Sequence, residues 1–438
     1  MAQQQTRASI LDIHFRARTV ALASLTVLAA LLALVPTAQA QTYHVLYSFT
    51  GGADGANPYA GLTMDAAGNL YGTANTGGYT GGNCASNLGC GTVFKLSPHG
   101  SGWMFTPLYA FKGDSGPNYD GAYPIARVVF GPDHSLYGTT EAGGGGSCYY
   151  FHNGCGTVFK LSPPATFCRT ALCPWTETLL YHAAADNGFE PSGDVIFDSA
   201  GNLYSTVALG GQYDGGYVFE LIPSTHGWTE RIVYSFNPGP DCNDSMAGLV
   251  FDASGNLYGT GNTGCGYGGV FQLMPSGSGW TENILLELNG FGNGDGTQAD
   301  LTSDGHGGFY GTATDLGPNG HGTVFQLVAS DGGFAYSLVY GFGGEGGAYP
   351  AAPVTLDASG THLYGTTRNS GDLGIGYGTV FELTLANGAW TQNVLHYFGG
   401  SDGQFPVSSV LFDADGNMYG TTSYGGAYNS GVVWEITP

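Results

Sequence analysis

Short stretches in which apolar and polar residues alternate recur along the whole chain, and glycine-rich turns separate them. One of them, 70–73, reads Leu-Tyr-Gly-Thr and follows the turn sequence Asp-Ala-Ala-Gly-Asn at 65–69. With small changes the phrase returns six times, at 136–139, 203–206, 257–260, 309–312, 363–366 and 418–421. A repeat of roughly 50 to 70 residues that contains several short strands predicts a radial array of sheets.

Each repeat contains four predicted strands, because the alternation and the bounding turns divide it into four pieces. In the first repeat these pieces are 61–64, 69–73, 91–96 and 103–111. The third strand carries the sequence Val-Phe, or Val-Trp in the last repeat. These pairs lie at 93–94, 158–159, 218–219, 270–271, 324–325, 380–381 and 433–434.

The chain begins and ends out of phase with this repeat. It ends directly after a third strand, whereas 42–49 has the Leu-Tyr-x-Phe pattern of a fourth strand and precedes the first repeat. We therefore predict an all-β fold: a seven-bladed β-propeller over 41–438, with four antiparallel strands per blade and the N-terminal strand completing the last blade. The expected repeat units are 58–111, 124–182, 191–236, 245–288, 297–342, 350–398 and 406–438 together with 42–49.

Packing accounts for most of the repeated phrase. Tyr71, Phe94 and their copies are expected to fill the space between blades, and the glycines to serve tight turns. The aspartate before the phrase is expected to cap its turn by accepting backbone amides. It stands in register at Asp65, Asp198, Asp252, Asp304 and Asp413, is displaced by one residue at Asp357, and is replaced by Gly131 in the second repeat.

The repeated phrases resemble a known family. Gly-Asn-Leu-Tyr-Gly-Thr, Gly-Gly, Gly-Thr-Val-Phe-Lys-Leu and Leu-Tyr-x-Phe, in this order over about 42–438, are similar to the GloVer (Gloeo/Verruco) tandem repeat of exported bacterial proteins. The resemblance implies a repeat architecture and export. It implies no particular activity, because that family is defined by its repeat and by varied C-terminal sorting signals. No such signal follows Pro438, so we expect free release rather than attachment to the cell surface.

Composition supports many short strands and limits the partners. The chain has 77 glycines, 28 tyrosines and 24 phenylalanines, and its glycines stand in recurring turns between aromatic and β-branched runs. Its formal net charge is −23, and only 10% of its residues are charged. Such a surface repels phosphate backbones and anionic lipid, so we expect no binding to nucleic acid and no membrane insertion after export.

The N-terminal residues 1–40 have the pattern of a signal peptide. Three arginines precede the apolar run 20–35, and Ala-Gln-Ala at 38–40 offers small residues for cleavage before Gln41. An uncleaved anchor is the alternative, but an apolar run of this length is short for a bilayer. We expect a secreted or periplasmic monomer.

Export makes disulfides the expected state of the cysteines, which are even in number and all follow the cleavage site. Proximity suggests Cys84 with Cys90, Cys148 with Cys155, Cys168 with Cys173, and Cys242 with Cys265. Spacing alone does not choose among the possible pairings. A zinc site is the rival, without support from a Cys-x-x-Cys pair.

Acids recur in the loops that lead from a fourth strand to the next first strand. They are Asp54, Asp120, Asp186, Asp244, Asp295, Glu345 and Asp402. In a propeller these loops share one side with the loops between strands two and three. A ring of carboxylates there is a candidate site for calcium, or for a cationic or polyhydroxyl ligand. The alternative is that Asp-Gly is a turn sequence and the acids are solvated.

The first position of the innermost strand, called here the channel position, varies, while its neighbour is apolar in every copy. The channel positions are Gly61, Arg127, Asp194, Gly248, Asp300, Pro353 and Ser409. Two acids and an arginine near a channel mouth suit a ligand site, or acid–base chemistry on a glycoside. A structural ion pair lining a wet channel is the alternative.

Other catalytic patterns are missing from the sequence. It has no His-x-x-x-His pair and no phosphate-binding lysine in a glycine-rich loop. The leading hypothesis is an exported, non-enzymatic binding or surface-interaction propeller without a cofactor, whose extracellular ligand is a glycan or a protein. The alternative is a carbohydrate-active hydrolase or lyase that uses the channel acids.

Overall fold

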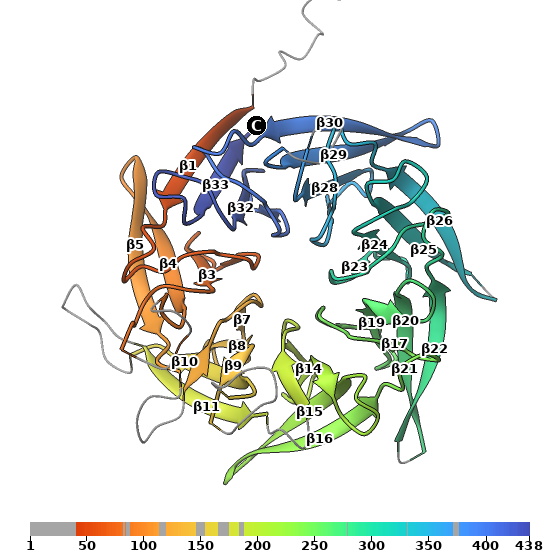
Figure 1. Cartoon of the computed structure of the whole chain (residues 1–438), viewed down its shortest axis with the longest axis horizontal. Helices are drawn as coiled ribbons and strands as arrows, with labels where there is room; N and C mark the ends of the chain where they lie inside the picture. The colour runs from red at the N-terminus through yellow and green to blue at the C-terminus, as the bar shows by residue number, and fades with distance from the viewer. Residues whose placement is uncertain are drawn as a thin grey trace, which may run out of the picture. The chain divides into compact units, whose positions relative to one another are not determined.

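Seven antiparallel sheets surround a central axis (Figure 1). The computed structural model describes residues 41–438 apart from 82–83, 85–87, 114–119, 146–153, 165–174, 184–187, 278, 331 and 371–375. Tyr43–Thr437 form one compact unit. Within the described ranges, no helix is long and apolar enough to cross a membrane. The predicted all-β, seven-bladed propeller is confirmed.

The four strands of each blade run outward from the axis in chain order. The innermost strands are β2 (Thr63–Met64), β7 (Val129–Phe130), β13 (Ile196–Phe197), β18 (Val250–Phe251), β23 (Thr302–Ser303), β27 (Thr355–Leu356) and β31 (Leu411–Phe412). The second strands, which carry the repeated phrase, are β3 (Leu70–Ala74), β8 (Leu136–Thr140), β14 (Leu203–Gly210), β19 (Leu257–Gly261), β24 (Phe309–Ala313), β28 (His362–Thr367) and β32 (Met418–Thr422).

The outer half of each blade is longer. The third strands are β4 (Thr92–His99), β10 (Thr157–Ser162), β15 (Tyr217–Ser224), β21 (Gly269–Ser276), β25 (Thr323–Ser330), β29 (Thr379–Ala386) and β33 (Val432–Thr437). The outermost strands are β5 (Gly102–Ala110), β11 (Thr176–His182), β16 (Gly227–Ser235), β22 (Gly279–Glu287), β26 (Gly333–Gly341), β30 (Ala389–Tyr397) and β1 (Thr42–Ser48). Short loop strands are β6 (Gly121–Ala122), β9 (Ala142–Gly143), β12 (Gly188–Pro191), β17 (Cys242–Asn243) and β20 (Thr263–Gly264). We number the blades 1 to 7 from β2 onward.

The N-terminal strand closes the ring. Blade 7 has the order β1-β33-β32-β31, so its outermost strand comes from the other end of the unit (Figure 1). Its Tyr43 ring stacks on His396 of blade 6 at 3.8 Å, and the Tyr43 hydroxyl donates to the carbonyl of Asp402. The predicted closure is thereby confirmed. The innermost strands pair over only two residues, fewer than predicted, because the backbone just before them bonds to the preceding blade instead.

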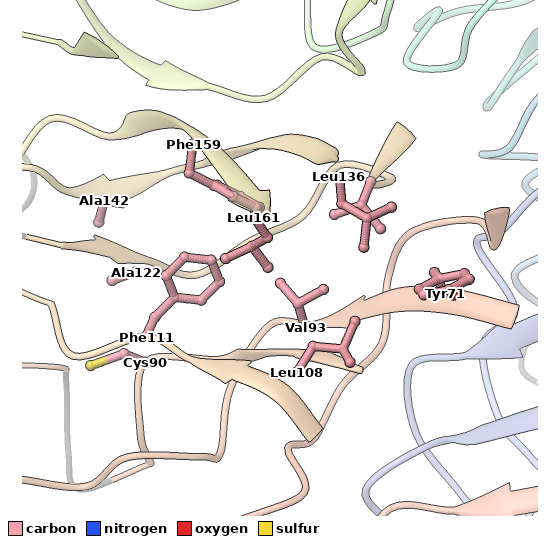
Figure 2. Close-up of a cluster of buried hydrophobic side chains, with 11 residues drawn as sticks. Tyr71, Cys90, Val93, Leu108, Phe111, Ala122, Leu136, Ala142, Phe159 and Leu161 are labelled. Atoms are coloured by element: carbon pink, nitrogen blue, oxygen red, sulfur yellow. The ribbon is translucent and has the colours of Figure 1, made fainter. Parts of the chain in front are cut away.

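The side chains of the repeated phrase pack between blades, as predicted. Figure 2 shows the contact between blades 1 and 2, where Tyr71 and Val93 of one blade meet Leu136 and Phe159 of the next. All four are buried. Because each blade buries its apolar face against its neighbour, the core is a chain of interblade clusters rather than one central core.

The threonine of the phrase links each blade to the next by a hydrogen bond. Its hydroxyl donates to the carbonyl that precedes the channel position of the following blade, over 2.9 to 3.3 Å. The seven pairs are Thr73–Ala126, Thr139–Gly193, Thr206–Ala247, Thr260–Ala299, Thr312–Ala352, Thr366–Ser408 and Thr421–Ala60. The last pair joins blade 7 to blade 1, so these bonds run once around the axis.

We expect Thr312→Val to lower the free energy of unfolding by about 1–3 kcal/mol, because the buried carbonyl of Ala352 loses its donor while the side-chain volume is kept. Urea unfolding measures the change. The control is Thr391→Val, since Thr391 is exposed and should change stability by less than about 0.5 kcal/mol. Equal effects of the two substitutions would contradict a stabilising role for the threonine bonds.

The glycine of the phrase faces the aromatic ring of the third strand. A Cβ on Gly72 would lie 2.6 Å from the tip of Phe94, and one on Gly311 would lie 2.4 Å from the tip of Phe325. These pairs are directly opposite in the sheet register. The glycine is therefore required for close packing rather than for a turn. Blade 3 differs, because Ser205 stands there and donates to the carbonyl of Gly193.

The aspartate before the phrase caps its turn, as predicted. Asp65 accepts the backbone amides of Ala67 and Asn69 at 2.9 and 3.0 Å, and it also accepts the hydroxyl of Tyr71 at 3.0 Å. These bonds lower the pKa of Asp65 against the opposing effect of its burial. In blade 2 the turn lacks this residue, and Asp133 accepts the amide of Ser135 and the hydroxyl of Tyr137 instead.

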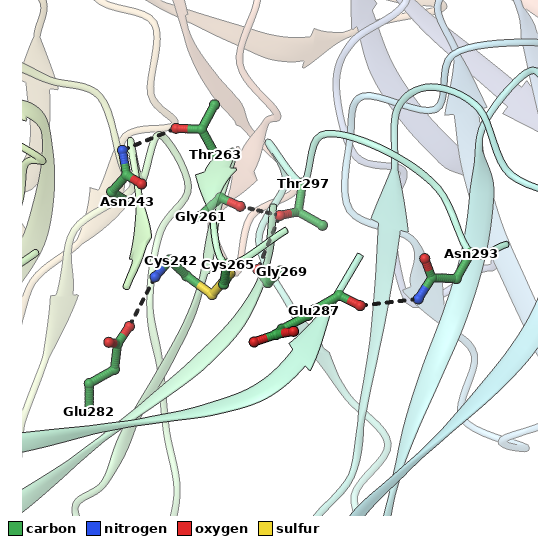
Figure 3. The surroundings of a disulfide bond; sticks show 10 residues. All are labelled: Cys242, Asn243, Gly261, Thr263, Cys265, Gly269, Glu282, Glu287, Asn293 and Thr297. Atoms are coloured by element: carbon green, nitrogen blue, oxygen red, sulfur yellow. Dashed lines mark hydrogen bonds between the residues drawn. A yellow bond between two sulfur atoms is a disulfide. The ribbon is translucent and has the colours of Figure 1, made fainter. Parts of the chain in front are cut away.

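Two of the four expected disulfides are confirmed. Cys84 is bonded to Cys90, and Cys242 is bonded to Cys265 (Figure 3). Cys155 is also disulfide-bonded. The other cysteines of the two remaining predicted pairs, Cys148, Cys168 and Cys173, lie outside the described residues. Around the second disulfide, the amide of Cys242 donates to Glu282 of β22 at 3.3 Å (Figure 3).

Glu282 makes stability depend on pH. Burial, followed by the charge of Asp241 and a hydrogen bond to it, raises the pKa of Glu282 to about 8, against 4.5 ordinarily. Between these values the folded chain holds a proton that the unfolded chain has lost, so the free energy of unfolding falls as the pH rises from about 4.5 to about 8. We expect Glu282→Gln to be more stable than the wild type at pH 8 and indistinguishable at pH 4.5, as unfolding curves at both pH values will show. A wild-type advantage at pH 8 would contradict this.

Candidate functional site

One side of the propeller carries both classes of long loop, which we call the loop-rich side. In every blade the loop entering from the preceding blade pairs with the segment after the second strand, so both lie together. The pairs are Ala56–Thr76, β6–β9, β12–β14, β17–β20, Asp295–Asp315, Ala348–Asn369 and Gln404–Tyr424. The sequence prediction that these two loop classes share one side agrees with this pairing.

A cavity of about 930 Å³ lies on the axis and is lined by all seven blades. Two rings of side chains approach it from the loop-rich side. The first, two residues before the channel positions, is Tyr59, Ile125, Ser192, Met246, Gln298, Ala351 and Val407. The second consists of the channel positions, of which Gly61, Arg127, Asp194, Asp300, Pro353 and Ser409 line the cavity. A cavity of this size, lined by apolar side chains and by polar and charged ones in similar measure, can hold a small ligand.

The three charged channel residues lie together in the wall of this cavity. Arg127 donates from Nε to Asp194 Oδ2 at 2.9 Å and from its backbone amide to Asp194 Oδ1 at 2.7 Å. Asp300 accepts the amide of Gly248 at 2.6 Å. Burial, together with the nearby charge of Asp194, raises the pKa of Asp300, while the charge of Arg127 opposes this rise. The structure therefore brings together the arginine and both acids that the sequence singled out.

Gly248 makes room for this arrangement. A Cβ at Gly248 would lie 2.9 Å from Asp194 Cβ and 3.2 Å from each carboxylate oxygen of Asp300. Its missing side chain lets acids from blades 3 and 5 approach each other across blade 4. The site therefore holds two carboxyl groups and one guanidinium group close together.

The loop acids do not converge on one site, because several form hydrogen bonds within their own loops and with the strand end beside them. Asp54 accepts the Tyr47 hydroxyl and the Thr50 amide, Asp120 accepts the Tyr109 hydroxyl and the Gly121 amide, and Asp402 accepts the Gly399 amide. Each of these acids ties the end of an outermost strand to the loop that follows it. Across the part of the chain that the structure describes, no three His, Cys, Asp or Glu side chains gather in a way that could hold a metal ion.

The other predicted acids have different surroundings. Asp244 accepts the amide of the Asn262 side chain at 3.1 Å, Asp295 pairs through its backbone with Asp315, and Glu345 is exposed. Asp186 lies outside the described residues. In blades 3 and 4 the strand-end role belongs to Asp241 and Asn293, which the sequence analysis missed. The spacing could have found one of them, because Asp241 follows Tyr234 by the same interval as Asp54 follows Tyr47.

A ring of left-handed residues around the cavity mouth was not predicted from the sequence. Each lies two residues before the first ring of cavity residues, with φ between 55° and 69° for every non-glycine member. They are Asn57, Tyr123, Glu190, Asp244, Gly296, Tyr349 and Phe405. Five of the seven precede a proline, which is the sequence signal that could have identified them.

Solved structures with similar folds are distant in sequence. The extracellular domain of a one-component system from B. thetaiotaomicron is 11% identical, with a TM-score of 0.49, and the match covers 90% of this chain and 40% of that one. A protein from Lactobacillus plantarum is 15% identical, with a TM-score of 0.49 and coverage of 80% and 87%. A protein assigned as a 6-phosphogluconolactonase from Bacteroides fragilis is 15% identical, with a TM-score of 0.49 and coverage of 85% and 98%. None of these similarities bears on activity.

Sequence comparison identifies the repeat itself. No curated protein is significantly similar to this chain. The family profile of the Gloeobacter/Verrucomicrobia repeat, in contrast, matches residues 34–177, 152–376 and 317–438. These matches overlap and span the propeller, in agreement with the resemblance drawn from the repeated phrases. The chain therefore belongs to the Gloeobacter/Verrucomicrobia repeat family.

Proposed function

We propose that this protein is an exported, non-enzymatic binding propeller that takes an uncharged polyhydroxyl ligand, a carbohydrate, into its axial cavity from the loop-rich side. The observation that carries the proposal is the cavity itself. Its mouth combines the apolar surface of Tyr59, Ile125 and Met246 with the neutral polar groups of Gln298 and Ser192. Apolar faces beside hydrogen-bonding groups suit a sugar.

Two further features support an uncharged ligand. The hydroxyl oxygen of Ser192 is buried and has no hydrogen-bond partner among the described residues, and such a group is costly unless something else satisfies it. The strongly negative chain disfavours anions at long range, and Arg127 in the cavity wall already neutralises Asp194. Disulfides in the described part are compatible with an extracellular location.

A second candidate function, a carbohydrate-active hydrolase or lyase, is favoured by one observation. Asp300 has a raised pKa and lies beside Asp194, which forms a salt bridge with Arg127. A protonated and an ionised carboxyl are the pair that glycoside cleavage uses.

One experiment separates the two functions. The exported chain is incubated with insoluble cellulose, xylan, mannan and starch, and both retention on the polymer and release of reducing ends are measured. Retention without reducing ends supports the binding function. Reducing ends that disappear in Asp300→Asn would establish the hydrolase instead, and a lyase would be recognised by new unsaturated ends absorbing in the ultraviolet. Neither retention nor product from any polymer would overturn the carbohydrate proposal.

The proposal includes a binding site that needs no metal ion. Under it, a chelator leaves both polymer retention and the melting temperature unchanged. A loss of either on chelation, restored by calcium, would instead support the calcium alternative considered for the loop acids.

A further inference from the structure

On the loop-rich side, blades 6, 7 and 1 carry a cluster of aromatic side chains centred on Phe405. The rings of Tyr377 and Tyr424 meet the Phe405 ring nearly edge-on, with centroids 6.4 and 6.1 Å away. The guanidinium of Arg368 lies 5.8 Å from the centre of the Phe405 ring. The hydroxyls of Tyr424 and Tyr59 are 3.5 Å apart, and Tyr59 lines the cavity. We call these five residues the cradle.

The backbone of Phe405 is held in a conformation that costs energy. Its φ is 55°, a region that a bulky side chain rarely adopts and that glycine adopts freely. The conformation is fixed because its amide donates to the carbonyl of Tyr377, and its carbonyl accepts both the amide and the hydroxyl of Ser423. Blade 5 places Gly296 at the same position. Five other blades hold a non-glycine residue here as well, so the surroundings of Phe405, rather than its backbone alone, single it out.

The cradle is open to solvent and continues an aromatic surface. Tyr377 and Tyr424 are exposed, and so is Arg368. Across the described residues, the exposed tyrosine and phenylalanine side chains all lie in loops of the loop-rich side or at a strand end leading into one. They are Tyr79, Tyr213, Tyr267, Phe291, Tyr377, Tyr397, Tyr424 and Tyr428. Exposed aromatic surface gathered on one side of a molecule marks an interaction site.

Three members of the cradle, Tyr59, Tyr424 and Arg368, lie close enough to affect one another electrostatically. Burial, followed by the hydrogen bond to Tyr424, raises the pKa of the Tyr59 hydroxyl, and the charge of Arg368 opposes this rise. Tyr59 is thus a neutral hydroxyl at ordinary pH, able to donate or accept. Arg368 lies over the ring of Phe405 and offers several N–H donors in one plane.

This combination fits a sugar ring better than it fits a protein or an anionic polymer. A pyranose presents an apolar C–H face, which packs on an aromatic ring, and an edge of hydroxyls, which pairs with neutral hydroxyls and guanidinium donors. A stable protein interface takes about 20–30 residues on each side, many more than the cradle provides. An anionic polymer would meet the net negative charge of the chain.

We infer that the cradle is a sugar-binding subsite, in which one ring of an uncharged polysaccharide stacks on Phe405 while its hydroxyls contact Arg368 and Tyr59, at the entrance of the axial cavity. This rests on the proposed function and adds to it the residues that hold the ligand and the class of glycan they accept.

The decisive variant is Phe405→Gly, which removes the ring and relieves the left-handed conformation, so that folding is preserved. Tyr123→Gly is its matched control, because Tyr123 has the same backbone conformation, with φ of 59°, in blade 2 and lies outside the cradle. Calorimetric titration uses neutral hexasaccharides of β-1,4-glucose, α-1,4-glucose, β-1,4-xylose and β-1,4-mannose. Hexagalacturonate is the charged comparator, and melting temperatures report folding.

We expect Phe405→Gly to weaken binding of the neutral hexasaccharide about tenfold or more with no fall in melting temperature, and Tyr123→Gly to change binding by less than about twofold. Arg368→Gln should weaken binding by a smaller factor. Phe405→Gly could bind as tightly as the wild type while Ala351→Trp, which places a large side chain in the cavity, abolishes binding. In that case the cradle is not a sugar-binding subsite, and the proposed function of the cavity stands. If the wild type binds only hexagalacturonate, the inferred ligand class is wrong. If it binds no saccharide, the proposed function itself fails.

Discussion

Phe49→Ala should lower the free energy of unfolding by about 3–5 kcal/mol, the usual cost of removing a fully buried phenylalanine ring. Phe49 follows β1 and has no exposed surface. It packs in the cluster between blades 7 and 1, edge-on against Phe94 of blade 1 at 5.1 Å. The loss should be this large because the ring fills the joint at which the two ends of the propeller meet. Urea unfolding, monitored by circular dichroism, measures it.

Two further variants sharpen this prediction. Phe111 occupies the equivalent place between blades 1 and 2, edge-on against Phe159 at 5.1 Å, and the amides of both phenylalanines donate to a glycine carbonyl of the third strand. Phe111→Ala should therefore cost about as much as Phe49→Ala. Val45→Ala on β1 removes a side chain that is 39% exposed and should change stability by less than about 0.5 kcal/mol. If Phe49→Ala behaved like Val45→Ala, the closure would not stabilise the fold.

The architecture was predictable because the same pattern of strands and turns recurs in seven repeats along the chain. Each blade has the Leu-Tyr-Gly-Thr phrase or a close variant of it, and the displaced fourth strand at 42–49 has no partner except in the last blade. The role of the threonine was not predictable, because a hydrogen bond from Thr73 to Ala126 crosses between two repeats. Patterns within one strand carry no information about such a bond. The same holds for Gly72, whose closeness to Phe94 depends on the sheet register.

Of the candidate site, only the charged channel positions were predictable from the sequence. Arg127, Asp194 and Asp300 were found because the channel position varies beside an invariantly apolar neighbour. The loop acids, in contrast, were predicted from residue type alone, and the loops that contain them differ in length. The structure uses Asp241 rather than Asp244 at the strand end, because the distance from Tyr234 decides which residue reaches its hydroxyl. The cradle was missed, because aromatic residues in a tyrosine-rich chain look like core, and its members come together from three blades, which the sequence pattern does not show.

Breaking the Cys242–Cys265 disulfide should lower the free energy of unfolding by about 2–4 kcal/mol. The bond joins cysteines 23 residues apart, and it closes a loop that runs through β18 and β19 of blade 4 (Figure 3). Closing the loop restricts the unfolded chain, which is the main source of the effect. Cys242 and Cys265 are both buried, so reduced thiols would still pack at this place. The double variant Cys242→Ala/Cys265→Ala, unfolded in urea, gives the measurement.

The Cys84–Cys90 disulfide is the matched comparison, because its cysteines are only 6 residues apart. Since the entropy of loop closure grows with the logarithm of loop length, its removal should cost about 1 kcal/mol less than removal of the longer one. Wild-type protein unfolded with a reducing agent controls for the small cavities that alanine leaves. If the two double variants lost equal stability, restriction of the unfolded chain would not be the source. In that case the packing of Cys242 and Cys265 between blades 3 and 4 would account for the stabilisation instead.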